Sequence, residues 1–337
     1  MVILVLLLLT SVTGAQPNTA ANPAQEKQLR TPSQEAELGE AKRLADSVIR
    51  LFGERKFEEA VAPAKRALEL REKVLSKDDE LVNSAVLNLA EVQYARERFD
   101  QSKNLFERVL HSLQRTLGPD NVRLSNLLDR LAVNYFVLGQ PSETEKLYKQ
   151  SLAIRQKALG VNHRETAQSL YNLAEFYQLQ ENYKEAEPLY QELIDVRKKT
   201  NADAAQLVEA IDRYACLLRK QKRTAEADQI EGQGPGAPHS DKTEPVINVG
   251  VVNGKAIKLV QPPYPDEARA ARASGRVRVQ IVIGETGDVI RVCAVDGAKS
   301  LMKASESAAW RSKFSPTLLD GKPIRVRGVI IYNYAAY

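Results

Sequence analysis

The residues from Ser169 to Tyr190, SLYNLAEFYQLQENYKEAEPLY, hold the pattern that decides the fold of this chain. Apolar side chains recur three or four positions apart on both sides of a short polar stretch, which predicts two amphipathic helices joined by a turn. The pair Leu173-Ala174 recurs 42 residues earlier at Leu131-Ala132 and again at Leu89-Ala90. Because one helical hairpin cannot cover its own apolar face, hairpins that repeat at a fixed spacing stack into a solenoid.

The same spacing extends over much of the chain. Tyr214-Ala215 follows Leu173-Ala174 after 41 residues, and Gly118 and Gly160 each stand just past an apolar helical face, where glycine typically ends a helix. The periodicity predicts four full units at about residues 38–79, 80–121, 122–163 and 164–204, then a last helix and a short closing helix that ends near residue 231.

Strings such as Ser169–Tyr177 and Tyr183–Tyr190, with their 42-residue spacing, resemble the tetratricopeptide repeats of the kinesin-light-chain type over residues 38–231. The resemblance implies an array whose concave surface binds peptides or protein partners. On that geometry the groove is lined by polar first-helix positions beside the Leu-Ala pairs, namely Asn88, Glu91, Asn126, Arg130, Asn172, Glu175 and Arg213. Amide and guanidinium groups suit an extended peptide because they pair with backbone carbonyls and carboxylates. A solvated polar face is the alternative interpretation of these positions.

A second, different domain follows the repeats. Residues 232–247 are rich in Gly, Pro and polar residues, which is typical of a linker. Within residues 248–337, Asn253-Gly254 predicts a hairpin between 249–252 and 256–259. A short helix at 266–273, strands at 276–283 and 289–295, a helix at 301–310 and a long last strand at 324–334 complete the prediction. The pattern predicts a small α+β domain with an antiparallel sheet and helices on one face.

The C-terminal domain is basic. From Gly250 to Tyr337 there are 14 Lys and Arg against 7 Asp and Glu, while the whole chain has a net charge of +5. Aromatic residues are not interleaved among these basic residues, so we expect no nucleic-acid partner.

Several short motifs of this domain resemble the C-terminal domain of TonB: Tyr264-Pro265, Gly287-Asp-Val, Phe314-Ser-Pro316 and Gly321-Lys-Pro. The resemblance implies a periplasmic domain of Gram-negative bacteria that pairs a sheet edge with a short segment of an outer-membrane receptor. An unpaired last strand offers such an edge, and its docking residues are expected to be Arg325, Arg327, Val329 and Ile331. The two arginines favour an acidic segment. Alternatively, they keep the edge from aggregating.

The first residues predict export. Residues 1–15 form an apolar run that ends in small residues, which is typical of a signal peptide cut after Ala15, and residues 16–37 form a polar segment. We therefore expect a periplasmic protein, with an uncleaved N terminus anchored in the inner membrane as the alternative. Cys216 and Cys293 are too few for a disulfide framework, so two free cysteines are expected.

Motifs of catalysis were not found in the sequence: it has no HExxH, GxSxG or P-loop pattern, and no Cys/His cluster. We expect no catalytic residue, metal, cofactor or small-molecule substrate. The predicted function is a periplasmic adaptor for protein–protein interaction, in which the repeat groove binds a peptide or protein and the TonB-like domain docks on an outer-membrane receptor or envelope protein. The alternative is an atypical TonB-type energy-transducing component of outer-membrane transport.

Overall fold

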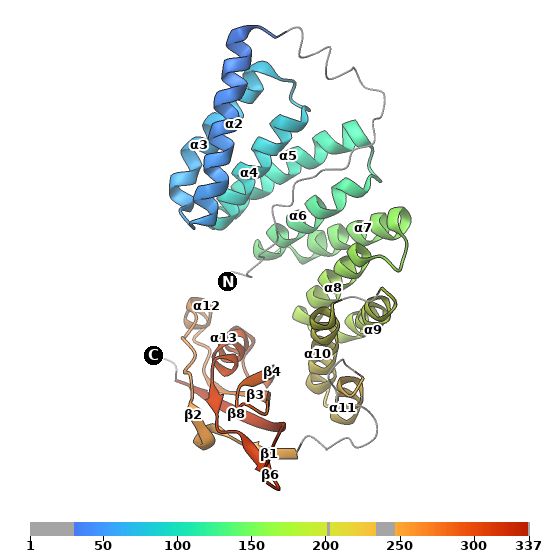
Figure 1. Cartoon of the computed structure of the whole chain (residues 1–337), viewed down its shortest axis with the longest axis vertical. Coiled ribbons are helices and arrows are strands. Elements are labelled where there is room, and N and C mark those ends of the chain that lie inside the picture. The colour runs from blue at the N-terminus through green and yellow to red at the C-terminus, as the bar shows by residue number, and fades with distance from the viewer. Residues whose placement is uncertain (1–29, 201–202, 234–246, 336–337) are drawn as a thin grey trace. The chain divides into compact units, whose positions relative to one another are not determined.

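The computed structural model describes residues 30–200, 203–233 and 247–335 (Figure 1). The predicted signal peptide at 1–15, residues 16–29 of the polar segment and residues 234–246 of the linker lie outside these ranges. Two compact units divide the chain, one ending at Pro119 and the other starting at Asp120.

The described part of the first unit is two helical hairpins. Thr31 caps the first helix, since its side chain and that of Gln34 each accept a hydrogen bond from the backbone N–H of the other residue. This helix therefore begins at Pro32, earlier than the predicted start of the array at residue 38. The helices are α2 (Pro32–Gly53), α3 (Phe57–Val74), α4 (Glu80–Ala95) and α5 (Phe99–Leu117).

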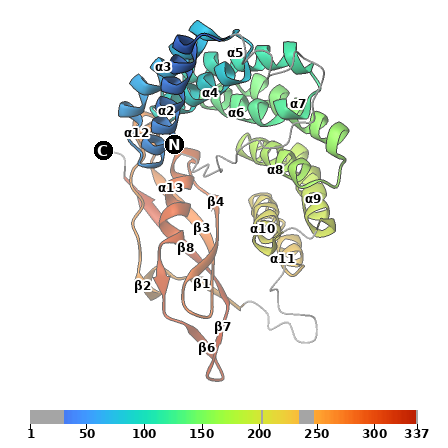
Figure 2. The ribbon, with the colours of Figure 1, turned by 45° about the horizontal axis from the view of Figure 1, so that its top comes forward.

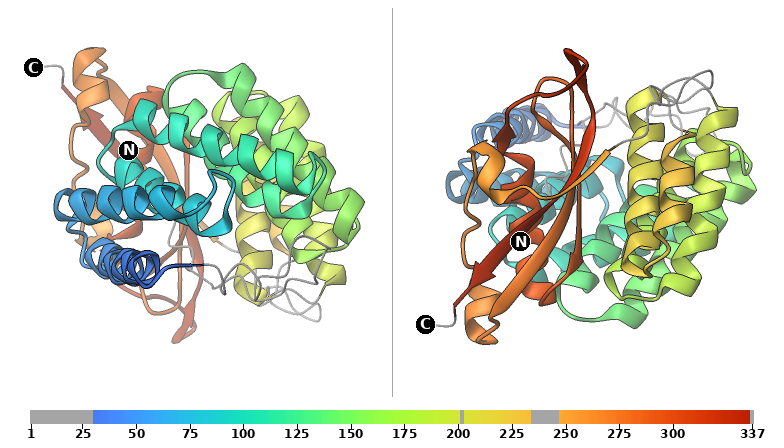
Figure 3. Two further views of the ribbon diagram at one scale, coloured as in Figure 1. Left: turned by 90° about the horizontal axis from the view of Figure 1, so that it is seen from above. Right: turned by 90° about the horizontal axis from the view of Figure 1, so that it is seen from below.

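The second unit starts with three more hairpins, whose helices lie side by side in Figure 3 in green and yellow. They are α6 (Ser125–Val137, after the 3-10 turn η1, Val122–Leu124), α7 (Pro141–Leu159), α8 (Arg164–Leu179), α9 (Tyr183–Lys199), α10 (Ala204–Lys220) and α11 (Thr224–Glu231). The predicted helical solenoid is confirmed. The small residues of the repeat, Ala90, Ala132, Ala174 and Ala215, are fully buried, as close helix packing requires.

One loop position caps the first helix of successive hairpins or, at Asn121, the 3-10 turn η1 that leads into it. The side chains of Asp79, Asn121, His163 and Asp203 each accept a hydrogen bond from the backbone N–H two residues on, at 2.8, 3.0, 3.2 and 3.3 Å. A side-chain acceptor at this point satisfies an N–H that the helix itself leaves unpaired. His163 is therefore a helix cap, and its imidazole is engaged in the fold.

The C-terminal domain is built on a four-stranded sheet of order β1-β8-β3-β4. Its strands are β1 (Ile247–Val251), β3 (Gly275–Ile283), β4 (Val289–Asp296) and β8 (Val326–Tyr334). Two small two-stranded sheets pair β2 (Ala256–Lys258) with β5 (Lys313–Phe314) and β6 (Thr317–Leu319) with β7 (Lys322–Ile324). The helices are α12 (Asp266–Ala270) and α13 (Lys299–Trp310), with a 3-10 turn η2 (Asn253–Lys255).

The two faces of this sheet differ. Val277, Val279 and Ile281 of β3 point to one face, where they pack with Leu301 and Ala308 of α13 in the domain core. Figure 2 shows α13 lying across the sheet. The alternate side chains point to the other face, which we call the second face and define by Gln280, Val282, Arg291, Cys293 and Arg327.

Three sequence predictions for this domain are wrong, the first being that the sheet is antiparallel throughout, since β1 runs parallel to β8. The Asn253-Gly254 segment is a 3-10 turn, and β1 and β2 do not form a hairpin, because β1 pairs in parallel with β8 and β2 pairs with β5. The last strand is also not an edge. β8 lies between β1 and β3, since Ile247 and Val251 stand opposite Val326 and Val329.

Candidate protein-interaction sites

The seven predicted groove residues lie on first helices of the hairpins. Asn88 and Glu91, both half-buried, belong to α4 of the first unit. The other five lie in the second unit, with Asn126 and Arg130 on α6, Asn172 and Glu175 on α8, and Arg213 on α10. We call the side of α6, α8 and α10 that bears these five residues the first-helix face.

Neighbouring helices are joined by polar contacts on the first-helix face. Arg213 Nη1 lies 3.2 Å from Glu175 Oε1, and the Tyr171 hydroxyl donates to Glu209 Oε1 at 3.1 Å. Burial, together with the nearby negative charge of Glu175, raises the pKa of Tyr171 above its usual value, so this hydroxyl stays a proton donor. Asn172 accepts a hydrogen bond from Gln168 Nε2 at 2.9 Å. The face thus presents hydrogen-bonding groups in a fixed arrangement.

Asn126 is held by a buried residue that sequence reasoning missed. Arg155 of α7 donates to Asn126 Oδ1 at 2.5 Å and to Asp129 Oδ2 at 2.8 Å, and its side chain is 2% exposed. Burial raises the pKa of Asp129, and the charge of Arg155 opposes that rise. A periodic signal was present, because Arg71 and Arg197 occupy the same repeat position in α3 and α9 and donate to the backbone carbonyls of Leu81 and Gln206.

Cys216 of α10 and Cys293 of β4 form a disulfide, with their Cα atoms 5.5 Å apart. The prediction of two free cysteines is therefore wrong. Cys216 occupies in α10 the repeat position that Glu175 occupies in α8. The second face of the sheet is thus attached to the first-helix face at its last helix.

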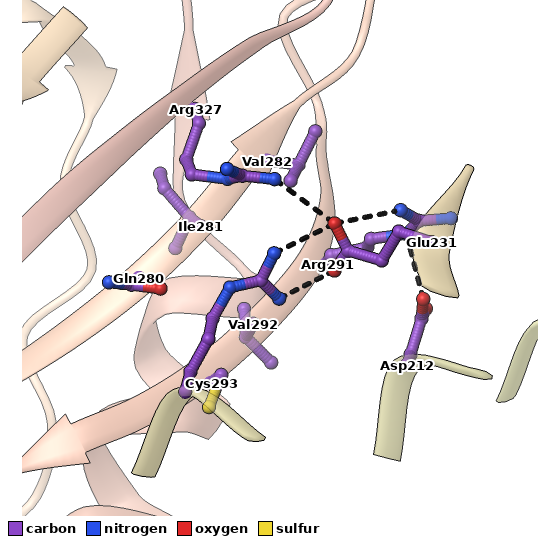
Figure 4. A pocket seen from close by; sticks show the side chains of 10 residues that line it. Asp212, Glu231, Gln280, Ile281, Val282, Arg291, Val292, Cys293 and Arg327 are labelled. Carbon is purple, nitrogen blue, oxygen red and sulfur yellow. Dashed lines mark hydrogen bonds and ion pairs between the residues drawn. The ribbon is translucent and has the colours of Figure 1, made fainter. Parts of the chain in front are cut away.

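An ionic cluster lies beside Cys293 (Figure 4). Glu231, at the end of α11, is 7% exposed and accepts from Arg219 at 2.5 and 2.8 Å and from Arg327 at 3.0 Å. Its Oε2 also lies 3.5 Å from Arg291, which pairs with Asp212 at 2.8 Å. Asp228 completes the cluster, 2.7 Å from Arg327 and 3.0 Å from Arg219. We call these residues and the disulfide the junction.

The junction leaves little free space. Its side chains and those of Gln280 and Val282 border a cavity of about 20 Å³. That volume suits about one water molecule, so the junction is no pocket for a small-molecule ligand. Burial raises the pKa of Asp212 to about 6, against the opposing effect of the Arg291 charge.

The predicted edge residues are engaged within the chain. Arg325 Nε lies 3.4 Å from Glu285, and Arg327 pairs with α11 as described. The Val329 carbonyl accepts from the Val252 N–H at 3.0 Å. Ile331 is held by the side chain of Asn253, which accepts from its N–H at 2.9 Å and donates to its carbonyl at 2.7 Å. The backbone N–H and C=O groups of Val329 and Ile331 are therefore hydrogen-bonded before any partner binds. This corrects the expectation that the last strand is an unpaired edge.

Among the described residues, no three His, Cys, Asp or Glu side chains are grouped so that they could hold a metal ion. No helix in these ranges combines the length and apolarity needed to cross a bilayer.

Stacked helical hairpins followed by a mixed sheet define a helical-repeat protein with a terminal α+β domain. Tetratricopeptide repeat models match residues 40–80, 80–157, 123–199 and 165–233, and the model of the Gram-negative bacterial TonB protein C-terminal domain matches residues 260–335. The chain belongs to the tetratricopeptide repeat proteins and carries a TonB C-terminal domain. Both are folds of protein–protein interaction.

Solved structures share the repeat fold. The kinesin light chain TPR-like repeats of Podosopora anserina align over 56% of this chain and 90% of theirs, at 21% identity and a TM-score of 0.51. Aspartyl phosphate phosphatase F of Bacillus subtilis aligns over 61% of this chain and 52% of its own, at 15% identity and a TM-score of 0.52. No curated protein sequence matches the chain.

Proposed function

We propose that this protein is a periplasmic adaptor. Its repeat array binds an extended peptide or a protein partner, and its TonB-type domain docks on an outer-membrane receptor or another envelope protein. The observation that carries the proposal is the attachment of one interaction module to the other by the disulfide between Cys216 and Cys293. Two modules that move together suit a protein whose role is to hold two partners near each other.

The first-helix face supports the proposed peptide site. Asn172 and its neighbour Gln168 supply amide groups, and the contact between Arg213 and Glu175 places both charge signs beside them. Such groups bind the backbone and the charged side chains of a peptide, whatever its sequence. The remaining proposed contacts are Asn126 and Arg130 in the second unit and Asn88 and Glu91 in the first.

The disulfide supports the proposed compartment. Disulfides persist in oxidising compartments such as the bacterial periplasm and are rare in the cytosol. Because Cys216 and Cys293 are bonded to each other, the protein fits an exported location.

The proposed docking edge is the outer side of β1 together with β8. β1 has five residues, of which four are exposed, and it is joined to β8 by an irregular parallel register. An extended segment of a partner extends the sheet by adding to β1, or takes its place beside β8. In the second arrangement the partner contacts Arg325, Val329 and Ile331. It also contacts Arg327 when the ion pairs of Arg327 with α11 are broken.

Photocrosslinking in the source bacterium tests the two sites. A photoreactive residue at Asn172 is expected to capture one partner that Lys146, an exposed position on α7, does not capture. A photoreactive residue in place of Val251 of β1 is expected to capture an outer-membrane or envelope protein. The same photoreactive residue in place of Arg311, after α13, is expected not to capture it. Identical products from each site and its control would contradict the proposal.

Cell fractionation tests the compartment. We expect the mature chain in the periplasmic fraction, beginning near Gln16. Recovery with the inner membrane, with its N terminus intact, would instead favour the energy-transducing alternative.

A further inference from the structure

The junction is a contact between two parts of the chain that the sequence separates widely. Cys216 and Cys293 are 77 residues apart, and Arg327 and Glu231 are 96 apart. Both contacts join the last hairpin of the array, α10 and α11, to the second face of the sheet. What holds the array to the TonB-type domain is therefore side-chain chemistry of two kinds, one covalent and one ionic.

The ion pairs of the junction form without any contribution from the cysteines. Three arginines, Arg219, Arg291 and Arg327, face three carboxylates, and Glu231 contacts all three arginines. Arg291 and Arg327 come from the sheet, whereas all the carboxylates come from the array. Their attraction thus acts across the contact, and it does not depend on the oxidation state of the cysteines.

The covalent part lies beside this cluster. Cys293 follows Arg291 by two residues on the same face of β4, and Cys216 follows Asp212 by four, one turn along α10. The ion pair between Arg291 and Asp212 therefore places the two sulfur atoms within bonding reach. Cys216 and Cys293 are 7% and 4% exposed, so the bond is shielded as long as the junction is closed.

We propose that the junction is a redox lock between the array and the TonB-type domain. In the reduced chain the ion pairs alone hold the contact, which opens and closes. Oxidation by a thiol–disulfide donor forms the Cys216–Cys293 bond: the donor's disulfide is reduced to two thiols, and the two cysteines give up two electrons and two protons. The oxidised chain is then held closed. This inference goes beyond the adaptor function, because it concerns how the two modules are held to each other.

Opening of the junction uncovers side chains on both the array and the sheet. It exposes Asp212 and Cys216 at the last helix of the first-helix face, together with Gln280 and Val282 of the sheet. The redox state of one bond thus determines whether these surfaces are available to other proteins.

Hydrogen exchange of the full-length chain tests the lock. Four samples are compared: the oxidised and the reduced wild type, and the oxidised and reduced R291A/R327A variant. R276A/R278A, which alters two exposed arginines of β3, is the matched control. Peptide mapping without reductant first establishes that the Cys216–Cys293 bond is present in the oxidised samples.

The expected result is non-additive. Exchange in α10 and β4 rises little when the arginines are removed from the oxidised chain. It rises by at least about tenfold when the same variant is reduced, because the junction then lacks both its disulfide and the two arginines of the sheet. Reduction of the wild type gives an intermediate rise, and reduced R276A/R278A behaves like the reduced wild type.

Two results would overturn the proposal. One is equal exchange in the oxidised and reduced wild type together with equal exchange in the oxidised and reduced R291A/R327A variant. The other is a peptide map in which the bond does not form. Exchange in β3 distinguishes opening from unfolding, because its core side chains stay packed against α13 when only the junction opens. If β3 loses protection in the variant, the comparison of oxidised and reduced wild type, which needs no substitution, decides alone.

Discussion

Arg327 of β8 and Glu231 of α11 are joined by a hydrogen-bonded ion pair of 3.0 Å, although 96 residues separate them in the chain. The sequence suggested that Arg327 faces an acidic segment of another protein. In the structure the acidic segment is the chain's own last repeat helix, which also supplies Asp228 at 2.7 Å. A residue expected to bind a partner thus holds the two modules of one chain together.

Glu231→Gln tests how much this ion pair contributes to stability. Glu231 is 7% exposed and contacts three arginines, so loss of its charge removes a buried negative partner from all three. We expect the free energy of unfolding of the second unit to fall by about 3 kcal/mol. Urea denaturation of the oxidised chain measures it. Glu226→Gln is the control on the same helix, where an exposed ion pair with Arg223 is screened by solvent and its loss should change stability little. Equal losses in the two variants would contradict the assignment.

Asp212 gives the junction a pH dependence. Its pKa is raised to about 6 by burial, against the opposing charges of Arg291, Arg219 and Arg213 and with a further rise from Glu231. Because the folded pKa lies above the unfolded value of 3.8, this group favours the folded state below about pH 4, and that contribution is lost as pH rises through 6.

Asp212→Asn has no such group to ionise. Relative to wild type, the stability of this variant should therefore increase by up to about 3 kcal/mol between pH 4 and pH 7. Urea denaturation at several pH values measures the difference between the two curves. Asp195→Asn, an exposed position on α9, serves as the control for the same substitution outside the junction. A difference for Asp212→Asn that does not change with pH would mean that burial does not raise the pKa of Asp212.

The repeat array was predictable because its contacts are local. The Leu-Ala pairs, the stop at Gly160 and the loop position of His163 each report on residues within one hairpin or on its neighbour. The pattern also placed Asn172 and Arg213 on first helices. It missed Arg155, because a charged residue in an amphipathic helix is ordinarily solvated, and its burial depends on Asp129 of the preceding helix.

The C-terminal sheet was predictable only in part. The alternation in β3 indicated the strand, since it reports on burial of one face. The pairing of β1 was missed, because Asn253-Gly254 is a strong local turn signal, whereas the true partner of β1 is β8, far along the chain. The sequence also predicts free thiols at Cys216 and Cys293, because two cysteines in different domains carry no local signal of their contact.

Arg155→Met tests the buried polar network of the array. The substitution leaves Asp129 buried without the charge that stabilises its ionised form, and we expect a loss of about 3 to 5 kcal/mol in unfolding free energy. Adding Asp129→Leu should recover much of this loss, because an apolar pair of similar size needs no desolvation of charge. Arg164→Met, at the exposed start of α8, is the control and should change stability little. Failure of the second substitution to recover stability would show that Arg155 stabilises the array through contacts other than its pair with Asp129.

Two of the TonB-like motifs meet at Gly287, and one substitution tests why they occur together. Gly287 has a φ of +83°, and its carbonyl accepts from the Phe314 N–H at 2.9 Å. A Cβ at this position would lie 2.0 Å from the Phe314 carbonyl oxygen, which belongs to the backbone and cannot rotate away. The Gly-Asp turn and the Phe-Ser-Pro segment are therefore packed backbone against backbone.

Gly287→Ala should lower the stability of the C-terminal domain by about 3 kcal/mol or more, since overpacking adds to the cost of a left-handed conformation. Gly254→Ala is the matched control, because a Cβ there meets no atom within 4 Å. Thermal unfolding of both variants measures the difference, and similar midpoints would show that the backbone at Gly287 shifts without cost.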